Sequence, residues 1–219
     1  ILAEGEYDIG DEIVDETGFT INNNTGFVFP ITADNLTIKA KDGADVVITS
    51  RYNPGAEQGG VWRNQNFITI SGEGVTIEGI DIKGNPNAYY DGTCNKAIEL
   101  VGGGKNLKLR DVEILPTKDS NGKLWSGSIY YNVKDAGECV LEDVTLYAWI
   151  YAREVTGSDN KITADGVVMD FRDNTYAGYS YKGQYSLNPG ISGTNVEIKD
   201  FTIKVDDKTK IEEQVFNDQ

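Results

Sequence analysis

Histidine is absent from this chain of 219 residues, and proline, cysteine and methionine are scarce. Without histidine, the chain cannot form a Ser–His–Asp triad, a Cys–His pair or a zinc site with histidine ligands. Acid–base chemistry must therefore come from Asp, Glu, Lys, Arg or Tyr side chains. No apolar run approaches the roughly 18 residues of a membrane-spanning helix, so we expect no membrane insertion.

Acidic residues outnumber basic residues, with 35 Asp and Glu against 20 Lys and Arg, which gives a formal net charge of −15. A field of this sign repels the phosphates of nucleic acids and the surface of anionic lipids. We therefore expect no nucleic-acid partner. The charge also disfavours an anionic polysaccharide unless a local basic patch or bound calcium compensates.

The two cysteines, Cys94 and Cys139, indicate little about the compartment. Two unpaired thiols are the favoured interpretation, and a disulfide remains an alternative that needs suitable geometry. The chain begins at Ile1 without a signal peptide. We therefore expect a mature form that has lost its targeting sequence.

An eight-residue pattern recurs along the chain and is the main evidence for the fold. Its copies span 75–82, 107–114, 139–146, 162–169 and 196–203, with a looser copy in 36–40 and 46–48. Apolar and polar residues alternate, and the phase then shifts in the middle of each copy. Residues one, three, six and eight face inward under period-two alternation, so the chain must bend between the two halves.

The fifth residue of each copy is a glycine or an aspartate: Gly79, Asp111, Asp143, Gly166 and Asp200. Both residue types tolerate unusual backbone angles, so each copy predicts two short strands joined at a bend. The bends are 32, 32, 23 and 34 residues apart. The shortest spacing suits one coil of a β-solenoid, and the longer spacings add an outward loop.

A further short strand is predicted before each copy, at 67–70, 97–100, 128–131, 149–152 and 184–187. We therefore predict an all-β fold, a right-handed parallel β-helix of about six coils whose inner faces are buried by stacking. The alternative is an antiparallel sandwich, which favours two-residue hairpin turns and an alternation of apolar and polar residues that is unbroken along each strand. The bend repeated in every copy favours the β-helix. The chain is expected to form one domain, with a lead-in or N-terminal cap at 1–34, coils at 35–206 and a C-terminal cap or linker at 207–219.

The segments ITISGEGVTIEGIDIKGN, AIELVGGGKNLKLRDVEIL and VEIKDFTIKV, with the opening ILAEGEYDIGDEI, resemble the pectate lyase-like (pectin lyase) superfamily. The resemblance implies a right-handed parallel β-helix. It leaves function open, because that superfamily contains lyases, glycoside hydrolases and non-catalytic adhesins. The family's enzymes usually have more coils, which favours a reduced, non-catalytic module or one piece of a larger surface protein. We expect the source to be bacterial and the module to be secreted or at the cell surface.

Aromatic residues gather in loops and in the strand that precedes each repeated copy. Flat rings flanked by polar groups are typical of sugar-binding sites. The candidate carbohydrate-binding residues are Tyr89, Tyr90, Asp91, Glu99, Trp125, Tyr130, Tyr151 and Tyr179. Tyr130 and Tyr151 are expected at equivalent outward positions, beside Glu99. In the alternative interpretation, the rings pack loops onto the body of the coils.

Two outward columns carry charge. Glu78, Arg110 and Glu142 are expected to form a ladder of alternating sign, with neighbours about 4.8 Å apart. Asp81 and Glu113 are candidate calcium ligands because calcium prefers oxygen. The resemblance implies lyases that hold calcium on acids of adjacent coils and use a nearby Arg or Lys as the base, which here cannot be placed.

We predict a monomeric, secreted or cell-surface module of carbohydrate-binding or adhesive type, without a catalytic residue and without a required cofactor. Its expected partner is a polysaccharide or glycan. Two alternatives stay open. One is a calcium-dependent polysaccharide lyase or a glycoside hydrolase of the same fold, and the other is a structural spacer of a larger surface protein.

Overall fold

The computed structural model describes residues 1–9, 13–14, 20–21, 29–49, 67–84, 96–118, 124–125, 127–147, 150–152, 154–170, 172 and 196–204. These residues form strands and turns and contain no helix. A search of the same residues accordingly finds no helix of the length and apolarity that spanning a bilayer requires.

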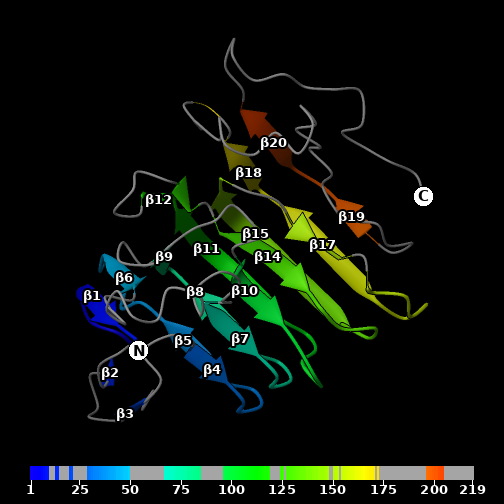
Figure 1. Cartoon of the computed structure of the whole chain (residues 1–219), viewed down its shortest axis with the longest axis horizontal. Coiled ribbons are helices and arrows are strands. Elements are labelled where there is room, and N and C mark those ends of the chain that lie inside the picture. The colour runs from blue at the N-terminus through cyan, green and yellow to red at the C-terminus, as the bar shows by residue number, and fades with distance from the viewer. Residues whose placement is uncertain are drawn as a thin grey trace, which may run out of the picture.

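A five-stranded sheet forms one side of the protein (Figure 1). Its strands, in sheet order, are β16 (Ile150–Tyr151), β14 (Ser128–Tyr131), β10 (Lys96–Leu100), β7 (Ile68–Ile70) and β4 (Phe29–Ile31). Every pairing in this sheet is parallel. Parallel neighbours far apart in sequence agree with a solenoid-like arrangement and not with a sandwich of hairpins.

The larger sheet has eleven strands and contains every copy of the repeated pattern. Its strands are β1 (Gly5–Asp8), β5 (Thr37–Lys39), β6 (Val46–Thr49), β8 (Thr76–Glu78), β9 (Asp81–Lys83), β11 (Lys108–Leu115), β15 (Glu138–Leu146), β17 (Lys161–Asp165), β18 (Val167–Asp170), β19 (Val196–Ile198) and β20 (Phe201–Lys204). All of its pairings are parallel as well. Figure 1 shows the strands following one another in chain order from the blue N-terminal end to the red C-terminal end.

Two antiparallel pairs lie outside these sheets. They are β2 (Ile13–Val14) with β3 (Thr20–Ile21), and β12 (Thr117–Lys118) with β13 (Leu124–Trp125). Strands β1 and β4 fall within the expected lead-in at 1–34, and both pair with strands of the two sheets.

The predicted bend in each repeat is confirmed at four of its five positions. Gly79, Asp111, Asp143 and Gly166 have φ angles of 65°, 49°, 52° and 70°. The left-handed region is accessible to glycine without cost and to aspartate more readily than to most residues. The backbone breaks into two strands at Gly79 and Gly166, whereas β11 and β15 continue through the bend. Asp200, in the last repeat, does not have a positive φ.

The core lies between the sheets and consists of the inward residues of each repeat. Ile77, Leu109, Leu141 and Ala164 occupy one column in register on β8, β11, β15 and β17. All four side chains have at most 1% of their surface exposed. Burying an Ile or Leu side chain contributes about 1.5–3 kcal/mol, so the repeated apolar columns supply most of the driving force.

The predicted charge ladder is present on the outside of the same strands. Arg110 lies opposite Glu78 on one side and Glu142 on the other. Its Nε donates to Glu142 Oε2 at 3.0 Å, and both side chains are nearly half exposed. An exposed pair of this kind contributes up to about 1 kcal/mol, so the ladder helps to set the register more than it sets the stability.

Candidate functional site

Three outward side chains form a column across the five-stranded sheet. Glu99 of β10 lies opposite Tyr130 of β14, and Tyr130 lies opposite Tyr151 of β16. In-register parallel pairing places these side chains about 4.8 Å apart along the stacking direction. The prediction that Tyr130 and Tyr151 occupy equivalent positions beside Glu99 is therefore confirmed.

The two tyrosine rings contact each other edge-on. Their centroids are 5.7 Å apart and their planes make an angle of 77°. Each residue is half-buried, so part of its surface reaches solvent. The Lys96 ammonium lies over the Tyr130 ring, 4.1 Å from its centroid. Cation and ring attract each other through the ring quadrupole.

Glu99 is a buried carboxylate, with 2% of its surface exposed. Its Oε1 accepts hydrogen bonds from Lys96 Nζ at 2.6 Å and from Asn132 Nδ2 at 3.0 Å. These bonds offset the cost of taking the charge out of water. Sequence reasoning missed Lys96, because a register shift between Lys96 and Ile98 brings the lysine to the outward column. It also missed Asn132, which comes directly after β14 and outside the predicted strand.

Of the remaining candidate sugar contacts, the backbone of Trp125 alone lies in the described part of the chain. Tyr89, Tyr90, Asp91 and Tyr179 lie outside the residues that the structure describes. The backbone of Trp125 pairs with Thr117 in the β12–β13 hairpin, and its side chain lies outside the described part.

The candidate calcium ligands lie on the larger sheet. Ile82 pairs with Ile114, which places Asp81 and Glu113 next to each other on adjacent strands. Partial burial raises the pKa of the Asp81 carboxyl, and repulsion by Glu113, Asp111 and Asp45 raises it further. Calcium takes about six to eight oxygen ligands. No group of three or more His, Cys, Asp or Glu side chains suited to a metal gathers among the described residues, so this pair alone does not complete a calcium site.

Other polar groups adjoin the acid pair. The Tyr147 hydroxyl donates to Glu113 Oε1 at 2.8 Å. Desolvation, followed by this bond to a carboxylate, raises the pKa of Tyr147 to about 12.

An ion pair lies near Tyr147. Arg172 binds Asp170 through Nε and Nη2, at 3.0 and 2.6 Å. The hydrogen bond from Arg172 lowers the pKa of Asp170. The repeated pattern does not predict an arginine at this place.

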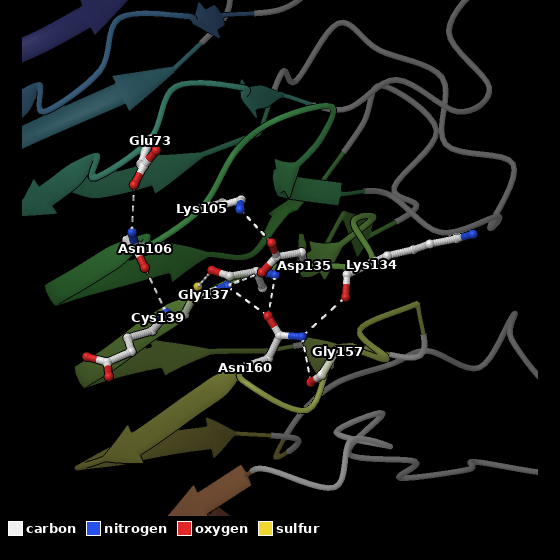
Figure 2. A network of polar contacts seen from close by, with 11 residues as sticks. Glu73, Lys105, Asn106, Lys134, Asp135, Gly137, Cys139, Gly157 and Asn160 are labelled. Atoms are coloured by element: carbon white, nitrogen blue, oxygen red, sulfur yellow. Dashed lines mark hydrogen bonds and ion pairs between the residues drawn. The ribbon is translucent and has the colours of Figure 1, made fainter.

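The most connected polar network lies at the turns that precede β11, β15 and β17 (Figure 2). Asn160 is 3% exposed, and its Oδ1 accepts from the backbone N–H groups of Ala136 and Gly137 at 2.7 and 2.9 Å. Its Nδ2 donates to the carbonyls of Lys134 and Gly157. All four contacts are to backbone, so Asn160 joins two neighbouring turns and serves the fold.

A second asparagine repeats this arrangement one turn earlier. Asn106 accepts from the Glu138 N–H at 2.8 Å and donates to Glu73 Oε1 at 3.1 Å. Lys105 and Asp135 form an exposed ion pair beside it (Figure 2). The side chains of this network bind one another and the backbone, which is the pattern of a structural brace between turns.

Cys139 is the one cysteine in the described part of the chain, and its thiol is free and buried. Burial raises its pKa to about 12, so it remains protonated and unreactive at neutral pH. The favoured interpretation, an unpaired thiol, is therefore confirmed for Cys139, which does not form a disulfide with Cys94. Cys94 itself lies outside the described residues.

Of these clusters, the column of Glu99, Tyr130 and Tyr151 combines ring surface with hydrogen-bonding groups, which is the chemistry that holds sugars. The acid pair has two carboxylates, a phenol and a guanidinium nearby, which is a set that can position a polar substrate. Comparison of the chain with protein-family models, with curated proteins and with solved structures found no match.

Proposed function

We propose that this chain is a carbohydrate-binding module of a bacterial protein that is secreted or displayed at the cell surface. Its fold is a right-handed parallel β-helix of about six coils, similar to the pectate lyase-like superfamily but without catalytic function. The parallel, in-register sheets support this fold. The module is monomeric and uses no cofactor.

One observation carries the binding function. Two half-buried tyrosines, Tyr130 and Tyr151, lie in register on an outward sheet face beside the buried Glu99 carboxylate and its Asn132 partner. A sugar presents an apolar ring face to an aromatic side chain and directs its hydroxyls to amides and carboxylates. The net charge of −15 favours a neutral glycan over a uronate polymer.

A glycan array tests this function. We expect the wild-type chain to bind at least one neutral glycan and the Tyr151→Ala variant to bind it about fivefold more weakly, because a stacked ring contributes on the order of 1 kcal/mol. Tyr7→Ala, which removes a half-buried tyrosine from β1 on the other sheet, is the matched control and should bind normally. A folded wild-type protein that binds no glycan would exclude the proposal and favour the structural spacer.

A second candidate is a polysaccharide lyase or glycoside hydrolase, and the acid pair favours it. Asp81 and Glu113 lie on adjacent strands, with Tyr147 bonded to Glu113 and Arg172 in the same neighbourhood. In the calcium-dependent version of this candidate, Asp81 and Glu113 are the calcium ligands. Any further ligands must come from other groups.

Ultraviolet absorbance of unsaturated products, measured on uronate polysaccharides with and without calcium, tests the lyase. Reducing-sugar release from the same panel tests the hydrolase. Either activity, if lost in Asp81→Ala and kept in Asp34→Ala, would establish the enzyme and displace the non-catalytic module. Asp34 is an exposed acid in the turn before β5 and serves as the control.

A further inference from the structure

The last repeat leaves part of the apolar core exposed. Ile198 of β19 lies in register with Ala164 of β17, so it continues the inward column that contains Ile77. The residues of that column on β8, β11, β15 and β17 are at most 1% exposed, whereas Ile198 is 46% exposed. The core is therefore open at its C-terminal end, where no further repeat is stacked on β19 among the described residues.

Strand β20 shows the same opening. Phe201 lies in register with Val167, and Ile203 with Met169. Val167 and Met169 are at most 1% exposed, whereas Phe201 and Ile203 are only half-buried. Within the described part of the chain, no strand pairs with the outer edge of β20 either. The end thus combines an apolar surface with a strand edge, and natural proteins cover such edges to avoid association.

The N-terminal end of the core is closed, and the first residues of the chain close it (Figure 1). Strand β1 pairs with β6, and the Leu2 N–H beside it donates to Lys39 O at 2.7 Å. Leu2 and Ile9 are 1% and 0% exposed. A terminal segment of this chain therefore covers one end of the stack.

The C-terminal tail, residues 205–219, follows β20 directly and lies outside the described residues. Ile211 is seven residues beyond Lys204, a stretch that reaches up to about 25 Å, and Val215 and Phe216 follow closely. The attachment to β20 keeps these apolar side chains at an effective concentration on the order of millimolar near the open end. The tail therefore has the composition and the reach to cover this end.

A second copy of the chain is a poorer occupant of the open end. The N-terminal end is closed, so head-to-tail stacking offers no second open core to join. Each copy carries a formal charge of −15, and repulsion between the copies opposes joining of two open ends. Docking of the tail also avoids the loss of translational and rotational freedom that association costs.

We propose that the C-terminal tail folds over β19 and β20 and closes the open end of the core. Ile211, Val215 and Phe216 supply the apolar surface that covers Ile198. The tail is then a cap of this module and not a linker to a following domain. By covering an apolar surface and a strand edge, the cap also keeps the module monomeric.

NMR spectroscopy of the isotopically labelled wild-type chain gives the direct test. We expect nuclear Overhauser effects between the methyl groups of Ile198 and protons of at least one of the three apolar tail residues. Hydrogen–deuterium exchange gives a second readout, with a variant that combines Ile211→Ser, Val215→Ser and Phe216→Ser. The amides of β19 and β20 should exchange at least about tenfold faster in this variant than in the wild type, because the cap no longer protects them.

A matched control changes three polar residues of the same tail, Thr209→Ser, Gln214→Ser and Asn217→Ser. It should exchange as the wild type does. The amides of β11, in the middle of the stack, report whether each variant is folded, and their exchange should be unchanged in both.

Overhauser effects from Ile198 to the tail, with faster exchange confined to β19 and β20, would confirm the cap. Absence of these effects in the wild type, or equal exchange in the two variants, would overturn it. Contacts of Ile198 with a second molecule in a mixture of labelled and unlabelled chains, together with a dimer in sedimentation velocity, would overturn it in favour of self-association.

Discussion

At the scale of single residues, Asn160 is the side chain whose removal should cost most outside the apolar core. Asn160→Ala leaves the backbone N–H groups of Ala136 and Gly137 without their side-chain acceptor. It also removes the side-chain donor from the carbonyls of Lys134 and Gly157. Each unsatisfied buried group costs about 1–3 kcal/mol. We expect urea denaturation to show a free energy of unfolding lower by about 2–4 kcal/mol.

Ser158→Ala provides the control for this prediction, because Ser158 is exposed in the same turn and bonds Asp159. Its effect should stay within about 0.5 kcal/mol. Similar losses of stability in the two variants would show that Asn160 has no special role in joining the turns.

Tyr147 should titrate far above an ordinary tyrosine. Its pKa rises from 10.0 to about 12, first through desolvation and then through its bond to the Glu113 carboxylate. A pKa raised in the folded state stabilises the fold fully below the unfolded pKa and loses that contribution as pH rises through the folded pKa. The corresponding loss of stability therefore falls between about pH 10 and pH 12.

Resonances of Tyr147 followed by NMR during an alkaline titration would measure this pKa. Glu113→Gln removes the carboxylate charge and should lower the pKa, because the phenolate then meets no like charge at 2.8 Å. An unchanged titration in Glu113→Gln would mean that burial alone sets the pKa.

Single residues also show where sequence reasoning stops. Asp111 and Asp143 were predicted at bends because each is the fifth residue of a repeated copy. The same position in every copy shows that the preference of aspartate and glycine for bends is used there. Lys96, Asn132 and Arg172 belong to no pattern. Their roles depend on a strand irregularity or on segments between repeats, which alternation does not encode.

At the scale of the strand pair, substitution of Gly166 by alanine tests whether the bend requires a glycine. Its φ is 70°, and a Cβ there would collide with the Asp143 carboxylate of the preceding repeat. Gly79 has a similar φ of 65°, but its Cβ would meet only the Ala40 Cβ at 3.4 Å. Both alanine variants incur a strain of about 1–2 kcal/mol, and Gly166→Ala adds an overpacking cost of about 1–3 kcal/mol.

Chemical denaturation of the two variants should therefore rank Gly166→Ala below Gly79→Ala in stability. The double variant Asp143→Gly with Gly166→Ala removes the colliding carboxylate and should recover the overpacking part of the loss. Equal stabilities for the two single variants would contradict the collision.

The strands themselves were largely accessible from the sequence. The expected strand at 128–131 is β14, the copy at 139–146 lies within β15, and all but the first residue of the copy at 107–114 lies within β11. The alternation of apolar and polar residues is enough to predict these strands, because stacking of the repeats buries one face of each strand. Two short strands joined at a bend were predicted in every copy, and the structure has them at Gly79 and Gly166. The prediction was wrong for β11 and β15, which continue through Asp111 and Asp143, because the phase shift alone does not distinguish a bent strand from a broken one.

At the scale of the whole molecule, the net charge of −15 opposes compaction. Added sodium chloride screens this repulsion over distances of about 10 Å at 0.1 M. It also weakens exposed pairs such as Arg110 with Glu142, which contribute up to about 1 kcal/mol each. Because acidic groups outnumber basic groups, we expect the repulsive part to dominate and the melting temperature to rise with salt.

Calorimetric scans over a series of sodium chloride concentrations at neutral pH would measure this effect. A variant in which Lys105 and Asp135 are both replaced by Ser keeps the net charge and removes one exposed ion pair. It should show the same rise. A melting temperature that falls with salt would mean that ion pairs outweigh the net repulsion.

The parallel stacking of the repeats also has a mechanical consequence. Hydrogen bonds such as those between β10 and β14 run along the direction in which the repeats follow one another. A force that pulls β1 away from β20 therefore acts on the interfaces between repeats in series, so each interface bears the full force. The weakest interface separates first, so the protein should extend under tension in discrete steps, one repeat at a time.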